Sequence, residues 1–133
     1  MQVKYILDTH TWMWWHMHPE KLSRKVKGLI AAQKYEEILL SAISVWEFCK
    51  LLEKGRIGIS CDPRDWLETA LAMPKLRLAP LSPMIAYRST ALPQLASADP
   101  ADQIIVATAI EENAVLLTKD ELIRQSKGLD TIW

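Results

Sequence analysis

The chain is predicted to adopt an α/β fold, with a central, mainly parallel β-sheet flanked by helices in three layers. Short apolar runs that suit buried strands alternate with segments of helical spacing, which is the pattern of a parallel sheet covered on both faces. Acidic residues directly follow three of the strand-like runs. In open α/β sheets, ligands bind beyond the carboxyl ends of the strands, so these acids point to a binding site there.

The predicted strands are short apolar runs bounded by polar residues. The first of them, Val3 to Leu7, is expected to be the central strand. The remaining strands are predicted over Ile38 to Ser41, Leu76 to Leu81 (interrupted by Pro80), Ala114 to Thr118 and, as an edge strand, Thr131 to Trp133.

Capping residues and helical spacing place the helices. A tryptophan-rich segment, Thr11 to His18, follows the first strand and stops at Pro19. The predicted helices begin at Ser23 (to Gln33), Ser44 (to about Gly55), Asp62-Pro63 (ending before Pro74), Ser82-Pro83 (to Leu92), Ala101 (to Glu112) and Asp120 (to Gln125).

Composition indicates an ordinary globular protein. The 133 residues, of which 50% are hydrophobic and 24% charged, fit a single domain over 1–133. A formal net charge of zero gives no global basic field, although an acidic metal site can cancel basic residues elsewhere. No apolar run is long enough for a membrane span, and the N-terminus has no secretion-signal pattern. We expect a cytoplasmic protein whose two cysteines, Cys49 and Cys61, are reduced thiols.

Four carboxylate-bearing stretches are the most informative feature of the chain. They are Ile6-Leu7-Asp8-Thr9, Ser44-Val45-Trp46-Glu47, Asp99-Pro100-Ala101-Asp102 and Leu117-Thr118-Lys119-Asp120. Taken singly, each acid suits a helix cap, and Ser44, Asp99 and Thr118 each begin a capping-box spacing. If the sheet is parallel, however, the acids share one edge and repel one another, and a bound cation is the usual remedy.

The ligand types favour a hard cation. Carboxylate oxygens suit Mg²⁺ or Mn²⁺, and the four stretches contain no histidine or cysteine, which argues against zinc. His10, two residues beyond Asp8, is the only nearby nitrogen ligand.

The four stretches, in this order, resemble the PIN-domain ribonucleases, and within them the VapC-type toxins of bacterial toxin–antitoxin pairs. Further resemblance lies in Gly55-Arg56-Ile57, Trp66-Leu67, Leu81-Ser82-Pro83, Ala91-Leu92-Pro93 and Ile104-Ile105-Val106-Ala107-Thr108-Ala109. These motifs extend over nearly the whole chain at family-like spacing.

The resemblance implies a PIN-like fold and a metal-dependent endoribonuclease. It makes Asp8, Glu47, Asp102 and Asp120 the catalytic acids around Mg²⁺ or Mn²⁺. Asp8, Asp102 and Asp120 are the favoured metal ligands, and Asp99 is an additional acid that binds metal or only caps its helix. Glu47 either orients the attacking water or acts as another ligand. Thr9 and Ser44 are candidate hydroxyls that support these acids, although local backbone capping explains them equally well.

The same resemblance implies partners: an RNA substrate, a cognate antitoxin and a second copy of the chain in a homodimer. Two positions depart from the family pattern. Ser97-Ala98 stands where relatives commonly carry His-Gly, and Gln103 stands where they commonly carry arginine. The missing arginine removes a candidate contact to phosphate or to an acid.

Basic and aromatic residues are candidates for contacts to RNA. The candidate phosphate contacts are Lys50, Lys54, Arg56 and Lys119, although solvated helix charges explain them equally well. Trp12 and Trp15 are spaced to share one helical face. If exposed they could stack on bases, but core packing or a protein partner suits them better. We expect Trp46 and Trp66 to lie in the core.

Three other functions fit parts of the pattern. A phosphoacceptor signalling domain also binds Mg²⁺ with acids at strand ends, but the first strand ends in the single Asp8 rather than an acidic pair. The departures at Ser97 and Gln103 leave open a PIN-like protein that only binds, although the intact set of acids argues against it. A nuclease for single-stranded DNA would use the same phosphodiester chemistry.

Overall fold

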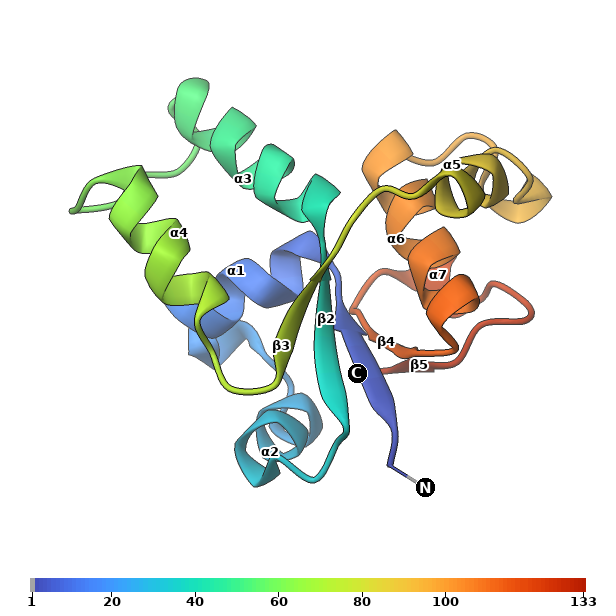
Figure 1. Ribbon diagram of the computed structural model, residues 1–133, viewed down its shortest axis with the longest axis horizontal. Helices are drawn as coiled ribbons and strands as arrows, with labels where there is room; N and C mark the ends of the chain where they lie inside the picture. Colours follow the sequence, from blue (N-terminus) through green and yellow to red (C-terminus); the bar gives the residue numbers. More distant parts are fainter. Residues whose placement is uncertain (1) are drawn as a thin grey trace.

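A five-stranded parallel sheet forms the centre of the protein in the computed structural model, which describes residues 2–133 (Figure 1). The strand order is β3-β2-β1-β4-β5, and all four pairings are parallel. The predicted fold class is therefore confirmed, and the first strand is central. The strands are β1 (Lys4–Leu7), β2 (Glu37–Ser41), β3 (Leu76–Ala79), β4 (Val115–Leu117) and β5 (Thr131–Ile132).

Helices cover both faces of this sheet. In Figure 1, α1, α2, α3 and α4 lie on one side of the strands, and α5, α6 and α7 lie on the other. The α-helices are α1 (Thr9–Met17), α2 (Arg24–Ala32), α3 (Ala42–Glu53), α4 (Pro63–Leu71), α5 (Pro83–Ser89), α6 (Pro100–Glu112) and α7 (Glu121–Arg124), with short 3₁₀ helices η1 (Pro19–Lys21) and η2 (Pro93–Leu95). Within residues 2–133, no helix has the length and apolarity needed to cross a membrane.

Alternation along the strands divides the interior into two cores. Successive side chains of a strand point to opposite faces, so Leu7 of β1 joins one core while its neighbour Ile6 joins the other. Leu40 and Leu39 of β2 divide in the same way. Because both faces are buried, the strands read in sequence as continuous apolar runs.

The first core is built around aromatic rings from three helices. Phe48 of α3 stacks on Trp66 of α4, with ring centroids 4.2 Å apart and planes 13° from parallel. The fully buried Trp12 of α1 meets both rings edge to face. These rings hold α1, α3 and α4 together on one face of the sheet.

The second core is dominated by α6. Asp99 caps the first turn and Pro100 stands at the first helical position, while Asn113 ends the helix in a left-handed conformation. The apolar residues between them pack against Ile6 and Leu39 of the sheet. The helix therefore starts at the edge of the sheet where the strands end.

Two predicted helix boundaries are wrong. Ser41, not Ser44, caps α3 by accepting a hydrogen bond from the backbone N–H of Ile43 (3.2 Å), and Ser44 is a buried residue within the helix. Helix α5 ends at Ser89 rather than Leu92, since a residue before proline, here Leu92 before Pro93, disfavours the helical conformation.

The prediction that Trp46 belongs to the core is also wrong. Its side chain is 55% exposed, while Ser44 and Phe48 of the same helix are buried. Residue 46 is two positions from each of these, which is about 200° around a helix. Trp46 therefore points away from the core. Trp66, in contrast, packs against the first core as expected.

We predict that Phe48→Ala lowers the free energy of unfolding by about 3 to 5 kcal/mol, because it removes the ring that stacks on Trp66 and leaves a cavity. Urea denaturation measures the change. Tyr87→Ala, at an aromatic residue that is 70% exposed, is the control and should change stability by less than about 0.5 kcal/mol. Equal effects of the two substitutions would contradict this account of the core.

A crevice lined by carboxylates

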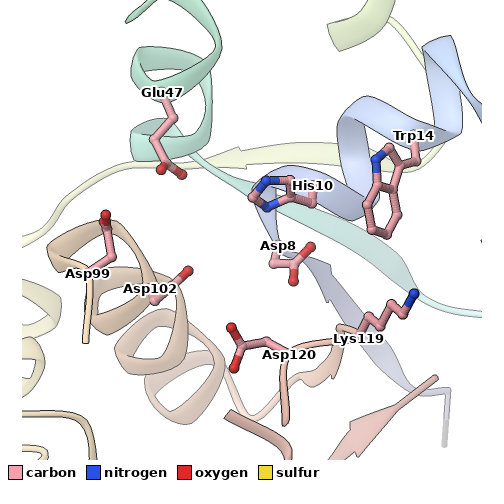
Figure 2. A pocket seen from close by; sticks show the side chains of 8 residues that line it. All are labelled: Asp8, His10, Trp14, Glu47, Asp99, Asp102, Lys119 and Asp120. Carbon is pink, nitrogen blue, oxygen red and sulfur yellow. The ribbon is translucent and has the colours of Figure 1, made fainter. Parts of the chain in front are cut away.

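Five acidic side chains meet in one crevice at the carboxyl edge of the sheet. The crevice has a volume of about 470 Å³. Its walls come from the end of β1, the first two turns of α1, the second turn of α3, the start of α6 and the segment between β4 and α7 (Figure 2). The residues that line it are Asp8, His10, Trp14, Glu47, Asp99, Asp102, Lys119 and Asp120. The structure thus brings together the acids of all four stretches that the sequence singles out.

Asp8 is held by both of its carboxylate oxygens. It caps α1, where Oδ1 accepts a hydrogen bond from the backbone N–H of Thr11 at 2.8 Å. The hydroxyl of Thr118, at the end of β4, donates to Oδ2. Asp8 and Thr118 are both buried. The two central strands therefore fix the orientation of this carboxylate.

Glu47 is oriented by the residue that follows Asp8. The Thr9 hydroxyl donates to the Glu47 carboxylate and lies 2.9 Å from the hydroxyl of Ser44, one turn earlier in α3. Thr9 and Ser44 are buried, whereas Glu47 is partly buried. These two hydroxyls thus connect the start of α1 to the acid on α3.

The other three acids stand at helix N-termini. Asp99 caps α6 by accepting from the backbone N–H of Ala101 at 2.9 Å, and Asp120 caps α7 by accepting from Ile123 at 3.0 Å. Asp102 lies in the first turn of α6. Asp120 rather than Thr118 is the cap, so the capping box suggested by Thr118 and Glu121 is wrong. Helix N-termini attract negative charge, which offsets part of the repulsion among these acids.

Burial and mutual repulsion change how readily two of the acids ionise. Burial, together with the charges of Asp120, Asp99, Glu47 and Asp8, raises the pKa of Asp102 from its ordinary value of 3.8 to about 7. Burial also raises the pKa of Glu47, which the hydrogen bond from Thr9 opposes in part. The crevice therefore favours either a shared proton or a bound cation.

The donor chemistry of the crevice suits a hard divalent cation, because all five of its acids offer oxygen ligands. Within residues 2–133, no three acidic, histidine or cysteine side chains lie close enough together to hold an ion as they stand. Asp8, Asp99 and Asp120 each direct one of their two carboxylate oxygens to a backbone N–H. The residues fit the ion by ligand type and charge, but they do not form an assembled set of ligands.

A second hollow, of about 450 Å³, continues from the crevice along α3. His10, Glu47 and Asp99 line both hollows. The second one also contains three of the four cations predicted to contact phosphate: Lys50, Lys54 and Arg56. The fourth, Lys119, lines the crevice itself.

Sequence reasoning missed two residues of this site. Thr118 was not expected to support an acid, yet its hydroxyl donates to Asp8 and accepts from the backbone N–H of Asp120 at 3.1 Å. Trp14 lines the crevice, with its ring 5.8 Å from that of His10. The helical spacing of His10 and Trp14, four residues apart, was the available signal.

The departure at Gln103 has a structural role. The Gln103 side chain donates a hydrogen bond to the backbone carbonyl of Leu95 at 2.7 Å. It thus ties α6 to the 3₁₀ helix η2 and does not line the crevice.

We predict that Asp102→Asn stabilises the metal-free protein above pH 7. Because the folded state raises the pKa of this carboxyl to about 7, it retains a proton between about pH 4 and 7 that the unfolded chain releases, so stability falls as pH rises through this window. Asparagine removes the charge. Urea denaturation in EDTA should show that the substitution raises the free energy of unfolding by about 1 to 2 kcal/mol at pH 8, after discounting for partial exposure. It should not raise it at pH 4.

The matched control is Asp65→Asn, at an exposed acid in the first turn of α4. It should show no comparable gain at pH 8. An Asp102→Asn protein that is no more stable than the parent at pH 8 would refute the claim that the crevice penalises this charge.

Comparisons with known proteins agree with the geometry. The PIN domain family model matches residues 5–128. Ribonuclease VapC22 of Mycobacterium tuberculosis is 34% identical over 130 residues, covering 96% of this chain and 97% of the relative. Among solved structures, VapBC2 from Rickettsia felis bound to a promoter DNA fragment superposes with a TM-score of 0.73 at 20% identity over 98% of both chains.

A toxin–antitoxin complex from Klebsiella pneumoniae gives a TM-score of 0.68 at 22% identity, covering 97% of this chain and 96% of that one. These structural similarities support the fold, and the family model and the curated relative extend over almost the whole chain. The chain belongs to the PIN-domain family.

Proposed function

We propose that the protein is a metal-dependent endoribonuclease that hydrolyses RNA phosphodiesters. The observation that carries this proposal is the meeting of Asp8, Glu47, Asp102 and Asp120, from four separate stretches of a PIN-domain chain, in one crevice. The relative named as a ribonuclease, which is similar along nearly its whole length, supports RNA as the substrate.

Asp8, Asp102 and Asp120 are proposed to hold Mg²⁺ or Mn²⁺, with Asp99 as a less central ligand. When bound, such an ion supplies Lewis acidity toward the phosphate and lowers the pKa of a bound water. The raised pKa of Asp102 supports this assignment, because a carboxylate that ionises with difficulty among other acids gains most from a neighbouring cation.

Glu47 is proposed to position and deprotonate the attacking water. Its partial burial and its raised pKa suit a general base, and the Thr9 hydroxyl holds its carboxylate toward the crevice. Thr9, Ser44 and Thr118 act as positioning residues, since each contacts an acid or the residue that holds one.

In the cell, we propose that residues 1–133 form a single PIN-like domain that acts as the toxin of a toxin–antitoxin pair, as a cytoplasmic homodimer. One solved structure of similar fold is named as a toxin–antitoxin complex, which supports an antitoxin partner.

We predict that the purified protein cleaves bacterial RNA in Mn²⁺ or Mg²⁺ and that EDTA stops the reaction. Asp8→Asn and Glu47→Gln should each reduce the rate by about 10²-fold or more, because they remove a ligand charge or the base. Asparagine is as good a helix cap as aspartate, so Asp8→Asn keeps the cap on α1. Gel analysis of total RNA measures cleavage, and circular dichroism confirms the fold.

Asp65→Asn, outside the crevice, should cleave at the parental rate. Full activity of Asp8→Asn, or cleavage that persists in EDTA, would rule out the proposed mechanism. Absence of cleavage by folded, antitoxin-free protein would favour the alternative of a PIN-like protein that only binds. Matched RNA and DNA strands distinguish a ribonuclease from a nuclease for single-stranded DNA.

We also predict that Lys54 and Arg56 bind phosphates. Lys54→Ala or Arg56→Ala should flatten the dependence of log K for RNA binding on log salt concentration by about 0.7, the value for one lost contact to a single strand. Fluorescence anisotropy over a salt series measures the slope. Lys25→Ala, at an exposed lysine of α2 outside both hollows, should leave it unchanged, and an equal change in this control would contradict the assignment.

A further inference from the structure

Trp46 differs from every other tryptophan of the protein in its surroundings. Five of the six tryptophans lie beside other aromatic rings: Trp12, Trp14, Trp15, Trp66 and Trp133. Among residues 2–133, no aromatic ring pairs with Trp46, and its side chain is 55% exposed. It therefore contributes little to either core, and its large apolar face is open to solvent.

The place of Trp46 connects it to the proposed active site. Its side chain lines the hollow along α3, which shares His10, Glu47 and Asp99 with the carboxylate crevice. Trp46 also borders a hollow at the start of α6. The residue thus lines a hollow that shares residues with the crevice, and it is next in sequence to the proposed base Glu47.

One cation lies near the Trp46 ring, and two more line the same hollow. The Nζ atom of Lys50 lies 5.7 Å from the centroid of the Trp46 ring, although Lys50 is also paired with Glu53 at 2.9 Å. Lys54 and Arg56 form no ion pair within residues 2–133. Residues 46, 50 and 54 follow one another at four-residue spacing along α3, so the row from the ring to Lys54 is ~12 Å long.

An aromatic face flanked by cations matches the chemistry of a single nucleic-acid strand, which offers bases for stacking and phosphates for ion pairs. A protein segment would also cover an apolar ring, but the unpaired cations Lys54 and Arg56 in the same hollow favour a polyanion. In duplex RNA the bases are already stacked and paired, so their faces are not available to the ring.

We infer that Trp46 is a stacking platform for one unpaired base of the RNA, next to the nucleotide that is cleaved. This inference rests on the proposed ribonuclease function and adds to it a site for one base on Trp46, outside the carboxylate crevice. Lys54 and Arg56 hold the phosphates of the strand on one side of the base, and the carboxylate crevice receives the scissile phosphate on the other.

The test uses Asp102→Asn protein in Mg²⁺, so that binding is measured without cleavage, and a fluorescent pool of random single-stranded RNA. Adding Trp46→Ala should weaken binding about 5- to 100-fold, whereas Trp46→Phe, which keeps an aromatic face, should weaken it less than about 3-fold. Binding to the same pool annealed to its complement should not change. The salt dependence should also stay the same, because no phosphate contact is removed.

Tyr87→Ala removes another exposed aromatic side chain, one that lines neither hollow, and should leave binding unchanged. A 2-aminopurine base in the RNA should lose fluorescence on binding the parent and not on binding Trp46→Ala, a signal that a purely structural role would not produce. Thermal unfolding verifies that the variants are folded.

Unchanged RNA binding by Trp46→Ala, or an equal loss with single strands and duplex, would overturn the inference. If either result is found and the wild-type protein still cleaves RNA, the proposed function stands and only the stacking role of Trp46 is refuted. If the wild-type protein neither binds nor cleaves RNA, both fail, and a protein partner becomes the better occupant of this surface.

Discussion

Repulsion among carboxylates is the constraint on which the rest of this structure depends. A sheet whose strands are all parallel brings the ends of β1, β2 and β4 to one edge, and the acids that follow them share a crevice of about 470 Å³. Helix N-termini lower this cost, because α1, α6 and α7 each begin at an acid that accepts backbone hydrogen bonds. Asp102, which does not cap a helix, is most affected by the remaining repulsion and by burial, and its pKa is raised to about 7. Helix capping and metal binding are therefore compatible roles for these acids. The helix N-termini reduce the repulsion among the carboxylates, and the repulsion that remains favours a bound cation.

Buried hydroxyls convert this gathering of acids into a defined arrangement. Thr118 donates to Asp8 and accepts from the backbone of Asp120, so one side chain joins two of the acids. Thr9, in the first turn of α1, donates to Glu47 of α3, and its hydroxyl also contacts that of Ser44. A hydroxyl adds no charge to the crevice, and it can donate to a carboxylate without neutralising it. Fixed orientation of the acids in this way lowers the reorganisation required when charge develops during a reaction.

The sequence predicts well the features that depend on neighbouring residues. Asp62-Pro63 and Ser82-Pro83 begin helices in the structure as expected, because a cap followed by proline acts within one turn. The convergence of the four acidic stretches was also predicted, but three details that depend on distant contacts were not. Ser44 does not cap α3 but contacts Thr9, 35 residues earlier, in the interior, and Ser41 is the cap. Trp46 was placed in the core because it is apolar, but the face of α3 that carries Ser44 and Phe48 is the buried one. Thr118 gave no signal, since its contact with Asp8 spans 110 positions.

Charge is separated along this surface, and that separation matters more than the net charge. The chain carries 16 basic and 16 acidic residues, which by itself suggests no affinity for a polyanion. Glu47 and Lys54 are seven positions apart, a rise of about 10 Å along a helix, which is about one Debye length at 0.1 M salt, so salt screens much of the interaction between these two charges. Lys54 and Arg56 can therefore attract a phosphate backbone although five acids lie in the adjoining crevice. Binding at the cationic end of the hollow holds the strand in place, so the repulsion at the acidic end has to be overcome only for the phosphate that enters the crevice.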